Sequence, residues 1–168
     1  MNKTALLEAL SKFIAQRPGL EWGNYGDATL YRSESRSITK DRHHAETLLR
    51  YVALRDSITA EDIIKASKES FSGRLTITAE GDGFRVDYCT GQYFPTEYRR
   101  AVCAVLASAI WSRIVEDMPP SDGTKVCTSV YGGNTYEVQT YQGIRAGEYI
   151  RKQARQELGA PIARRWFN

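Results

Sequence analysis

Apolar residues recur along the N-terminal part of the chain at the three- and four-residue spacings of a helix with one buried face. This pattern predicts a first helix over residues 4–16, with Thr4 as its N-cap and Pro18-Gly19 as its end. The side chains expected on its buried face are Leu6, Leu7, Leu10, Phe13 and Ile14.

A second helix, predicted over residues 28–54 behind the cap residue Asp27, has two unlike halves. Its C-terminal half carries an ordinary apolar stripe, formed by Ala45, Leu48, Leu49 and Val52. Its N-terminal half is mostly polar and charged, with the sequence RSESRSITKDRHH at residues 32–44. We expect this half to project beyond the core or to lie along polar partners.

A third helix is predicted to begin at Thr59, because Thr59-Ala60-Glu61-Asp62 combines an N-cap with an acidic first turn. Gly73 is the residue expected to end it. The side chains expected to face inward from this helix are Ile63, Ile64, Ala66, Ser67 and Phe71.

Alternating apolar and polar residues predict two antiparallel hairpins. The first covers residues 74–88 and turns at residues 80–83, where two glycines lie. The second covers residues 125–141 and turns at residues 132–134, with the sequence Gly-Gly-Asn.

A fourth helix is predicted over residues 95–117, and its middle is apolar on every face. Between Ala101 and Trp111 the only polar side chain is that of Ser108, which is typical of a helix buried on all sides. The residues expected to be almost fully buried are Val102, Val105, Leu106, Ala109 and Ile110. The predicted fold class is therefore α+β, a helix-rich single domain of residues 1–168 around this central helix, with one or two antiparallel β-hairpins.

The composition fits an ordinary globular chain, because 42% apolar residues can form a core without disulfides or metal. The three cysteines, Cys89, Cys103 and Cys127, match no zinc spacing and cannot all pair, so we expect free thiols. No apolar run approaches the roughly 20 residues of a membrane span. The N-terminus also lacks the apolar segment of a signal peptide. We therefore expect a cytoplasmic protein without a membrane partner.

The net charge of +3 excludes an acidic mimic of DNA and is too small to indicate nucleic-acid binding by itself. Residues 121–168, however, carry 7 basic and 4 acidic side chains, and two short basic helices are predicted there, at residues 146–158 and 161–167. The candidate nucleic-acid contacts on these helices are Arg151, Lys152, Arg155, Arg164 and Arg165. The alternative is a solvated helix face, with Trp166 and Phe167 packed into the core.

A stripe of like charge runs along the polar half of the second predicted helix. Arg32, Arg36 and Lys40 are spaced four residues apart, so they repel one another on one helix face. A surface for an acidic partner protein or a phosphate backbone would offset this repulsion. The alternative is pairing within the chain, with Glu34, Asp41, Glu46 or a distant carboxylate.

The segment before the fourth helix combines aromatic and basic residues, with Tyr93, Arg99 and Arg100 as its candidate partner contacts. The alternative for Tyr93 is a packing role at the helix entry. Arg99 and Arg100 lie close to the helix N-terminus, where cations are unfavourable. They are therefore expected to serve a partner or a fixed carboxylate such as Asp87 or Glu97.

Catalytic chemistry has little support in the sequence. Cys89 is a candidate nucleophile with His43 or His44 as its base, but no flanking signature accompanies it. Adjacent histidines on a helix point about 100° apart, so His43 and His44 cannot bind one metal ion together. The glycine-rich stretches at residues 23–26 and 132–134 match no phosphate-binding loop. We expect no catalytic residue, no metal site and no cofactor, and a small enzyme is the least favoured of the functional alternatives.

Two stretches carry a resemblance, FIAQRPGLEWGNYGDATLYRSESRSITKD at residues 13–41 and DYCTGQYFPTEYRRAVCAVLASAIW at residues 87–111. They resemble small uncharacterised proteins carried on plasmids and phages of Gram-negative bacteria. Proteins of such elements often act like anti-CRISPR inhibitors, which bind a host complex. The resemblance thus implies a non-enzymatic inhibitor of a host nucleic-acid-targeting complex, with a host protein or ribonucleoprotein as partner. Direct RNA or DNA binding by the basic helices is the alternative.

Overall fold

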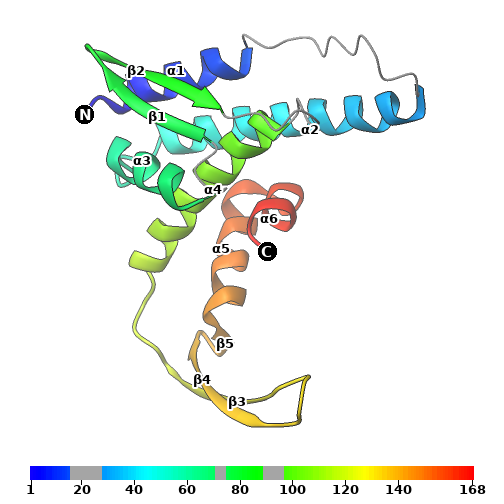
Figure 1. Cartoon of the computed structure of the whole chain (residues 1–168). Helices are drawn as coiled ribbons and strands as arrows, with labels where there is room; N and C mark the ends of the chain where they lie inside the picture. Colours follow the sequence, from blue (N-terminus) through cyan, green and yellow to red (C-terminus); the bar gives the residue numbers. More distant parts are fainter. Residues whose placement is uncertain (16–27, 71–74, 89–96) are drawn as a thin grey trace. The chain divides into compact units, whose positions relative to one another are not determined.

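The computed structural model describes residues 1–15, 28–70, 75–88 and 97–168, and for residues 28–40 and 97–98 it describes the backbone alone. Six helices and two small antiparallel sheets lie in these ranges, which confirms the predicted α+β class (Figure 1). The chain divides into two compact units, Met1–Ile110 and Trp111–Asn168. The expectation of one domain stays a prediction.

The first unit begins with α1 (Lys3–Ala15) and α2 (Ala28–Ala53). Every side chain predicted for the buried face of α1 is buried, and so is the whole apolar stripe in the C-terminal half of α2. The predicted cap of α1 was wrong by two positions. Asn2 caps this helix, because its Oδ1 accepts a hydrogen bond from the backbone N–H of Ala5 at 3.3 Å, whereas Thr4 is already helical.

Lys3 ties the start of α1 to the end of α2. Its Nζ donates to the backbone carbonyls of Val52, at 3.1 Å, and Arg55, at 2.7 Å. The last carbonyls of a helix have no partner within the helix and carry partial negative charge. An ammonium group at this place therefore satisfies them and stabilises the α1–α2 pair.

The helix α3 (Ala60–Glu69) begins as predicted, with a capping box. Thr59 Oγ1 accepts from the N–H of Asp62 at 3.2 Å, and Asp62 Oδ2 accepts from the N–H of Thr59 at 2.8 Å. The pKa of Glu61 is lowered, first by a hydrogen bond from its own backbone N–H and then by the N-terminal ammonium group, 3.3 Å away.

The end of α3 was predicted too late. The helix stops at Glu69, and the N–H of Ser70 closes the last turn on the carbonyl of Ala66 at 2.8 Å. Gly73, the expected stop, lies outside the described residues. Of the side chains predicted to face inward, Ile63, Ala66 and Ser67 are buried and Ile64 is half-buried, whereas Phe71 lies outside the described residues.

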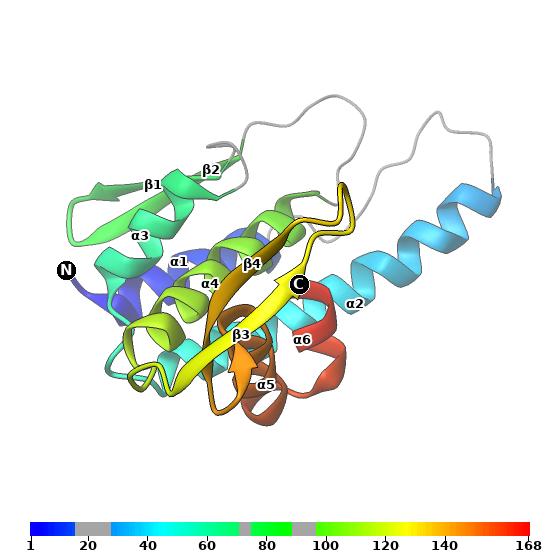
Figure 2. The same ribbon diagram turned by 90° about the horizontal axis from the view of Figure 1, so that it is seen from below.

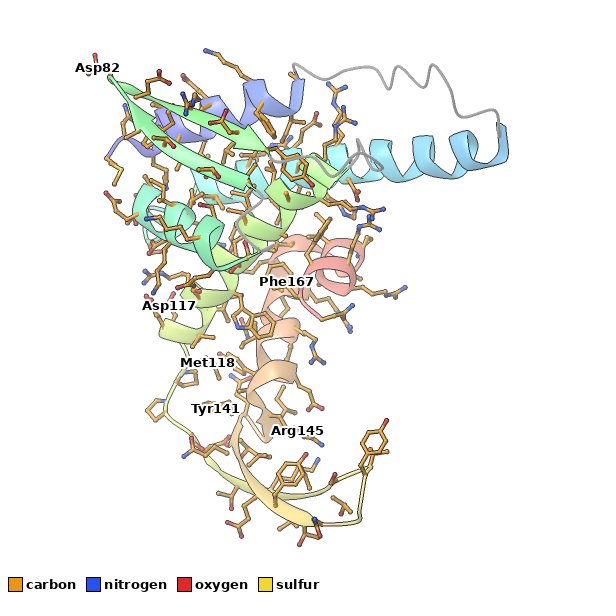
Figure 3. The ribbon with its side chains drawn as sticks, viewed as in Figure 1. Asp82, Asp117, Met118, Tyr141, Arg145 and Phe167 are labelled. Carbon is orange, nitrogen blue, oxygen red and sulfur yellow. The ribbon has the colours of Figure 1, made fainter. Side chains whose placement is uncertain are left out.

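The first predicted hairpin is confirmed as β1 (Leu75–Glu80) and β2 (Gly83–Tyr88). Gly81 and Asp82 form its two-residue turn, where Gly81 has a φ of +58° that favours glycine, and Figure 3 shows Asp82 at the tip. Within the first unit, β2 packs against α1 and β1 packs against α3 (Figure 1).

The central helix is confirmed as α4 (Glu97–Glu116). All five residues predicted to be almost fully buried, Val102, Val105, Leu106, Ala109 and Ile110, are at most 2% exposed. The helix ends before Pro119-Pro120, which cannot continue it. Its last turns, from Trp111 onward, belong to the second unit.

The second unit contains β3 (Gly123–Thr128), β4 (Thr135–Tyr141), β5 (Ile144–Arg145), α5 (Ala146–Leu158) and α6 (Ala160–Trp166). The strands β3 and β4 form the second predicted hairpin, and both C-terminal helices are confirmed. Figure 1 shows β4 and β5 at the end where α5 begins, and Figures 1 and 2 both show α6 folded back beside α5.

The short strand β5 was not predicted. It pairs with β4 across a two-residue turn in which Gln142 and Gly143 have φ angles of 51° and 74°. A carboxylate oxygen of Asp122 accepts from the N–H of Gly143 at 3.0 Å, and the other accepts from the hydroxyl of Thr140 at 2.8 Å. Asp122 therefore stabilises a turn that begins about twenty residues later in the chain.

Candidate nucleic-acid interface

The basic residues of α5 are separated from its apolar residues by helical geometry. Tyr149, Ile150 and Ala154 are buried, and Tyr149 lies against Tyr141 of β4 with ring centroids 6.4 Å apart. Arg151 and Arg155, one turn apart, are exposed on another face of the helix. Tyr149 therefore connects α5 to β4, and the exposed face of the helix presents its cations to solvent.

The position of α6 follows from a glycine and an aromatic pair. Gly159, with a φ of +88°, separates the two helices, and Pro161 in the first turn starts α6. Phe167 is fully buried and stacks on Trp111, with centroids 6.4 Å apart and planes at 20°. The alternative interpretation of this segment placed Trp166 and Phe167 in the core, which is observed for Phe167, whereas Trp166 is half-buried.

We define the C-terminal basic surface as the four exposed cations of these helices, Arg151, Lys152, Arg155 and Arg164. No ion pair within the described ranges includes any of the four. Lys152 Nζ contacts the neutral Gln142 Oε1 at 3.5 Å. Arg145, labelled in Figure 3 where β5 passes into α5, is also exposed.

Arg165, the fifth residue predicted for this surface, has a different environment. It is half-buried, and its guanidinium group lies 5.2 Å from the centroid of the Trp166 ring. This distance is that of a cation–π contact, which orients the guanidinium along the indole. Arg165 is therefore less available to a ligand than Arg164.

The hairpin β3–β4 exposes apolar side chains that the sequence reasoning missed. Val130 and Tyr131 in its turn are 92% and 90% exposed, and Val126 and Tyr136 on its strands are 62% and 46% exposed. The available signal was Val130-Tyr131 directly before Gly132-Gly133, which places two large apolar residues at the turn of the predicted hairpin, where loops run over the surface.

The stripe of Arg32, Arg36 and Lys40 lies on α2, whose backbone is helical from Ala28 onward. Their positions therefore recur along one helix face, as predicted. Their side chains lie outside the described part of the structure, and so does Tyr93. A partner-binding role for these residues stays a prediction.

Arg99 and Arg100 lie on α4 and contribute to the inside of the first unit. Arg99 is only 3% exposed. Arg100 Nε forms an ion pair with Asp41 Oδ2 of α2 at 3.2 Å, and Cys103 Sγ donates to the backbone carbonyl of Asp41 at 3.4 Å. The carboxylate that Arg100 meets is thus on α2, whereas Asp87 pairs with Arg85 at 2.8 Å.

The two histidines that were candidates for catalysis or metal binding differ in exposure. On α2, His43 is exposed and His44 is 3% exposed, as expected for adjacent helix positions. The described residues contain no group of three or more metal-ligating side chains close enough to bind one ion. Cys103 and Cys127 are buried free thiols, and Cys89 lies outside the described residues.

None of the helices in the described ranges combines the length and apolar character needed to cross a bilayer. Comparison of the chain with protein-family models, curated proteins and solved structures finds no match.

Proposed function

We propose that this chain is a binding protein that contacts the phosphate backbone of nucleic acid through its C-terminal basic surface. The observation that supports this proposal most directly is the exposure of Arg151, Lys152, Arg155 and Arg164 without an ion pair in the described structure. Cations that stabilise a fold usually meet a carboxylate, whereas cations that bind a polyanion face solvent in the free protein.

The spacing of these residues also favours a phosphate backbone. Arg151 and Arg155 are neighbours on one helix face, with Cβ atoms about 5–6 Å apart. This distance is similar to that between neighbouring phosphates of one strand. Guanidinium groups also bind phosphate oxygens in a bidentate geometry, which suits arginine to this role.

Replacing Arg151 and Arg155 by glutamine tests the proposal. Each lost phosphate contact reduces the slope of log K against log salt by about 0.9 for a duplex and about 0.7 for a single strand. The double variant should therefore lose roughly tenfold in affinity per contact near 0.1 M salt, and its slope should fall by about 1.4 for a single strand and about 1.8 for a duplex. Fluorescence anisotropy of labelled oligonucleotides across a salt series measures both quantities.

The matched control is Lys65→Gln with Lys68→Gln on α3, because both lysines are exposed and the change in net charge is the same. This control should keep the affinity and slope of the wild-type chain to within about twofold. Equal losses in the two double variants would show a general effect of net charge and would contradict a specific basic surface.

A second candidate function is inhibition of a host nucleic-acid-targeting complex by protein contact, in the cytoplasm, by a protein of a mobile element. The observation that favours it is the helical backbone of α2 across Arg32, Arg36 and Lys40, which brings three like charges onto one face. Such a face suits an acidic protein surface as well as it suits phosphates.

Reversing these three charges tests the second candidate. Arg32→Glu, Arg36→Glu and Lys40→Glu should abolish capture of a host complex from nuclease-treated lysate, because lost and repelled interface charges cost about 2–5 kcal/mol. Thermal unfolding should stay almost unchanged, since exposed charges usually alter stability by no more than about 0.5 kcal/mol.

A triple reversal of exposed lysines elsewhere in the first unit, Lys12→Glu, Lys65→Glu and Lys68→Glu, is the control for net charge. Loss of folding in the α2 variant would instead indicate that its three cations pair within the chain. Unchanged capture by a folded α2 variant would exclude this face as the interface.

A further inference from the structure

The turn of the β3–β4 hairpin presents an aromatic ring to solvent on an ordered backbone. Tyr131 is 90% exposed, and its neighbour Val130 is 92% exposed. The side-chain oxygen of Ser129 binds the backbone of Tyr131 twice, donating to its carbonyl at 2.8 Å and accepting from its N–H at 3.3 Å. The backbone beneath the ring is thus held in place although the ring itself contacts little.

The same turn is closed at its base. The N–H of Ser129 donates to the carbonyl of Asn134 at 2.8 Å, where β3 ends and β4 begins. Gly132 and Gly133 adopt φ angles of +90° and +67°, which side chains rarely tolerate. These features describe a defined turn that projects one aromatic ring outward.

We propose that Tyr131 stacks on an unpaired base of single-stranded nucleic acid whose phosphates are bound by the C-terminal basic surface. This inference rests on the proposed function. The hairpin and the basic surface belong to the same compact unit, in which Tyr141 at the end of β4 packs against Tyr149 of α5. The turn that carries Tyr131 lies at the other end of β4, about 20 Å away along the strand, so a strand of several nucleotides is needed to reach both contacts. Proteins that bind single strands combine a positive surface with exposed aromatic rings on which bases stack.

The chemistry around Tyr131 favours a base over a protein partner. The turn consists otherwise of small and polar residues, Ser129, Gly132, Gly133 and Asn134, apart from Val130. Val126 and Tyr136 of the strands are exposed as well, but the strand register places them on opposite faces of the hairpin. A stable protein interface buries roughly 1,200–2,000 Å² around an apolar centre, which these few scattered side chains cannot form. A base has the size of a single ring and stacks on it without further contacts.

The geometry of duplex nucleic acid favours the single strand. Bases inside a duplex are stacked on both faces, and an inserted side chain must first separate two base steps, at a cost of a few kcal/mol. An unpaired base is already accessible to a ring that projects from a turn. We therefore expect discrimination between strands with bases and strands without them.

The test compares an oligothymidylate with an abasic oligomer of the same length and charge. The wild-type chain should bind the oligothymidylate about fivefold or more tightly, because stacking on a base is worth about that factor or more. Tyr131→Ala should remove this preference and leave both the affinity for the abasic oligomer and the salt slope unchanged. Tyr131→Phe should retain the preference, since the ring remains.

Leu54→Ala is the control for truncating an exposed apolar residue, because Leu54 is 78% exposed on the first unit. It should change binding to neither oligomer.

The wild-type chain could bind the two oligomers equally, while Arg151→Gln and Arg155→Gln still reduce the salt slope. This result would overturn the stacking inference and leave the proposed function intact. Absence of salt-dependent binding to either oligomer would overturn the proposed function itself. A change of oligomeric state in Tyr131→Ala would overturn stacking in favour of contact between copies.

Discussion

Leu106→Ala is expected to lower the free energy of unfolding by about 2–5 kcal/mol. Leu106 lies in the middle of α4 and is 0% exposed, so truncation removes apolar contacts and leaves a cavity that its neighbours fill incompletely. A domain of this kind is stable by only about 5–15 kcal/mol, and the loss is therefore a large part of the total. Urea denaturation followed by circular dichroism measures it.

The control for this substitution is again Leu54→Ala, which removes the same atoms from a side chain that is 78% exposed. Its free energy of unfolding should stay within about 0.5 kcal/mol of the wild-type value. If Leu106→Ala behaved like Leu54→Ala, α4 would be a peripheral helix and the architecture described above would be wrong.

Arg100→Met is expected to cost about 3 kcal/mol of stability. Asp41 is 0% exposed, and its Oδ2 lies 3.2 Å from Arg100 Nε. Removing the guanidinium takes one compensating cation away from a buried carboxylate. The value lies at the low end of the range for buried pairs because the Arg100 side chain is 43% exposed, which lets water screen the interaction.

An exposed ion pair provides the matched control. Arg85 and Asp87 are 59% and 55% exposed, with a distance of 2.8 Å between Arg85 Nε and Asp87 Oδ2. Arg85→Met makes the same chemical change and should cost less than about 1 kcal/mol. Similar effects of the two substitutions in urea denaturation would contradict a stabilising role for the buried contact between α2 and α4.

The sequence predicted the helices of this chain well because each has a periodic apolar face or is apolar throughout. The buried faces of α1 and of the C-terminal half of α2 were predicted residue by residue, as was the buried middle of α4. In each case burial follows from local periodicity, since a helix that buries one residue also buries those three and four positions away. The capping box at Thr59 is equally local.

The errors concern features that depend on distant residues or on helix ends. The strand β5 contains only Ile144 and Arg145, too few to show an alternating pattern, and its turn is held by Asp122 of another segment. The N-cap of α1 and the C-terminal end of α3 were misplaced by a few positions, because several residues near a helix end can satisfy its free backbone groups.

The candidate sites were predicted unevenly, for a related reason. The exposure of Arg151, Lys152, Arg155 and Arg164 follows from the amphipathic pattern of α5 and from the shortness of α6. The partner of Arg100 does not follow from any local pattern, because Asp41 lies 59 residues earlier in the chain. Nor does the exposure of Tyr131, since an aromatic residue next to a glycine turn can pack back onto its strands or project from them.

By itself, therefore, the sequence determined the α+β class, the helical faces, both hairpins and the basic character of the C-terminal helices, because periodicity, turn residues and caps act within a few positions of the chain. Only the tertiary structure decided that Arg100 meets the buried Asp41, that Phe167 stacks on Trp111 and that Tyr131 stays in solvent. Contacts of this kind join segments that are far apart in sequence. They form when helices and strands pack against one another, and no local pattern of residues specifies which side chains then meet.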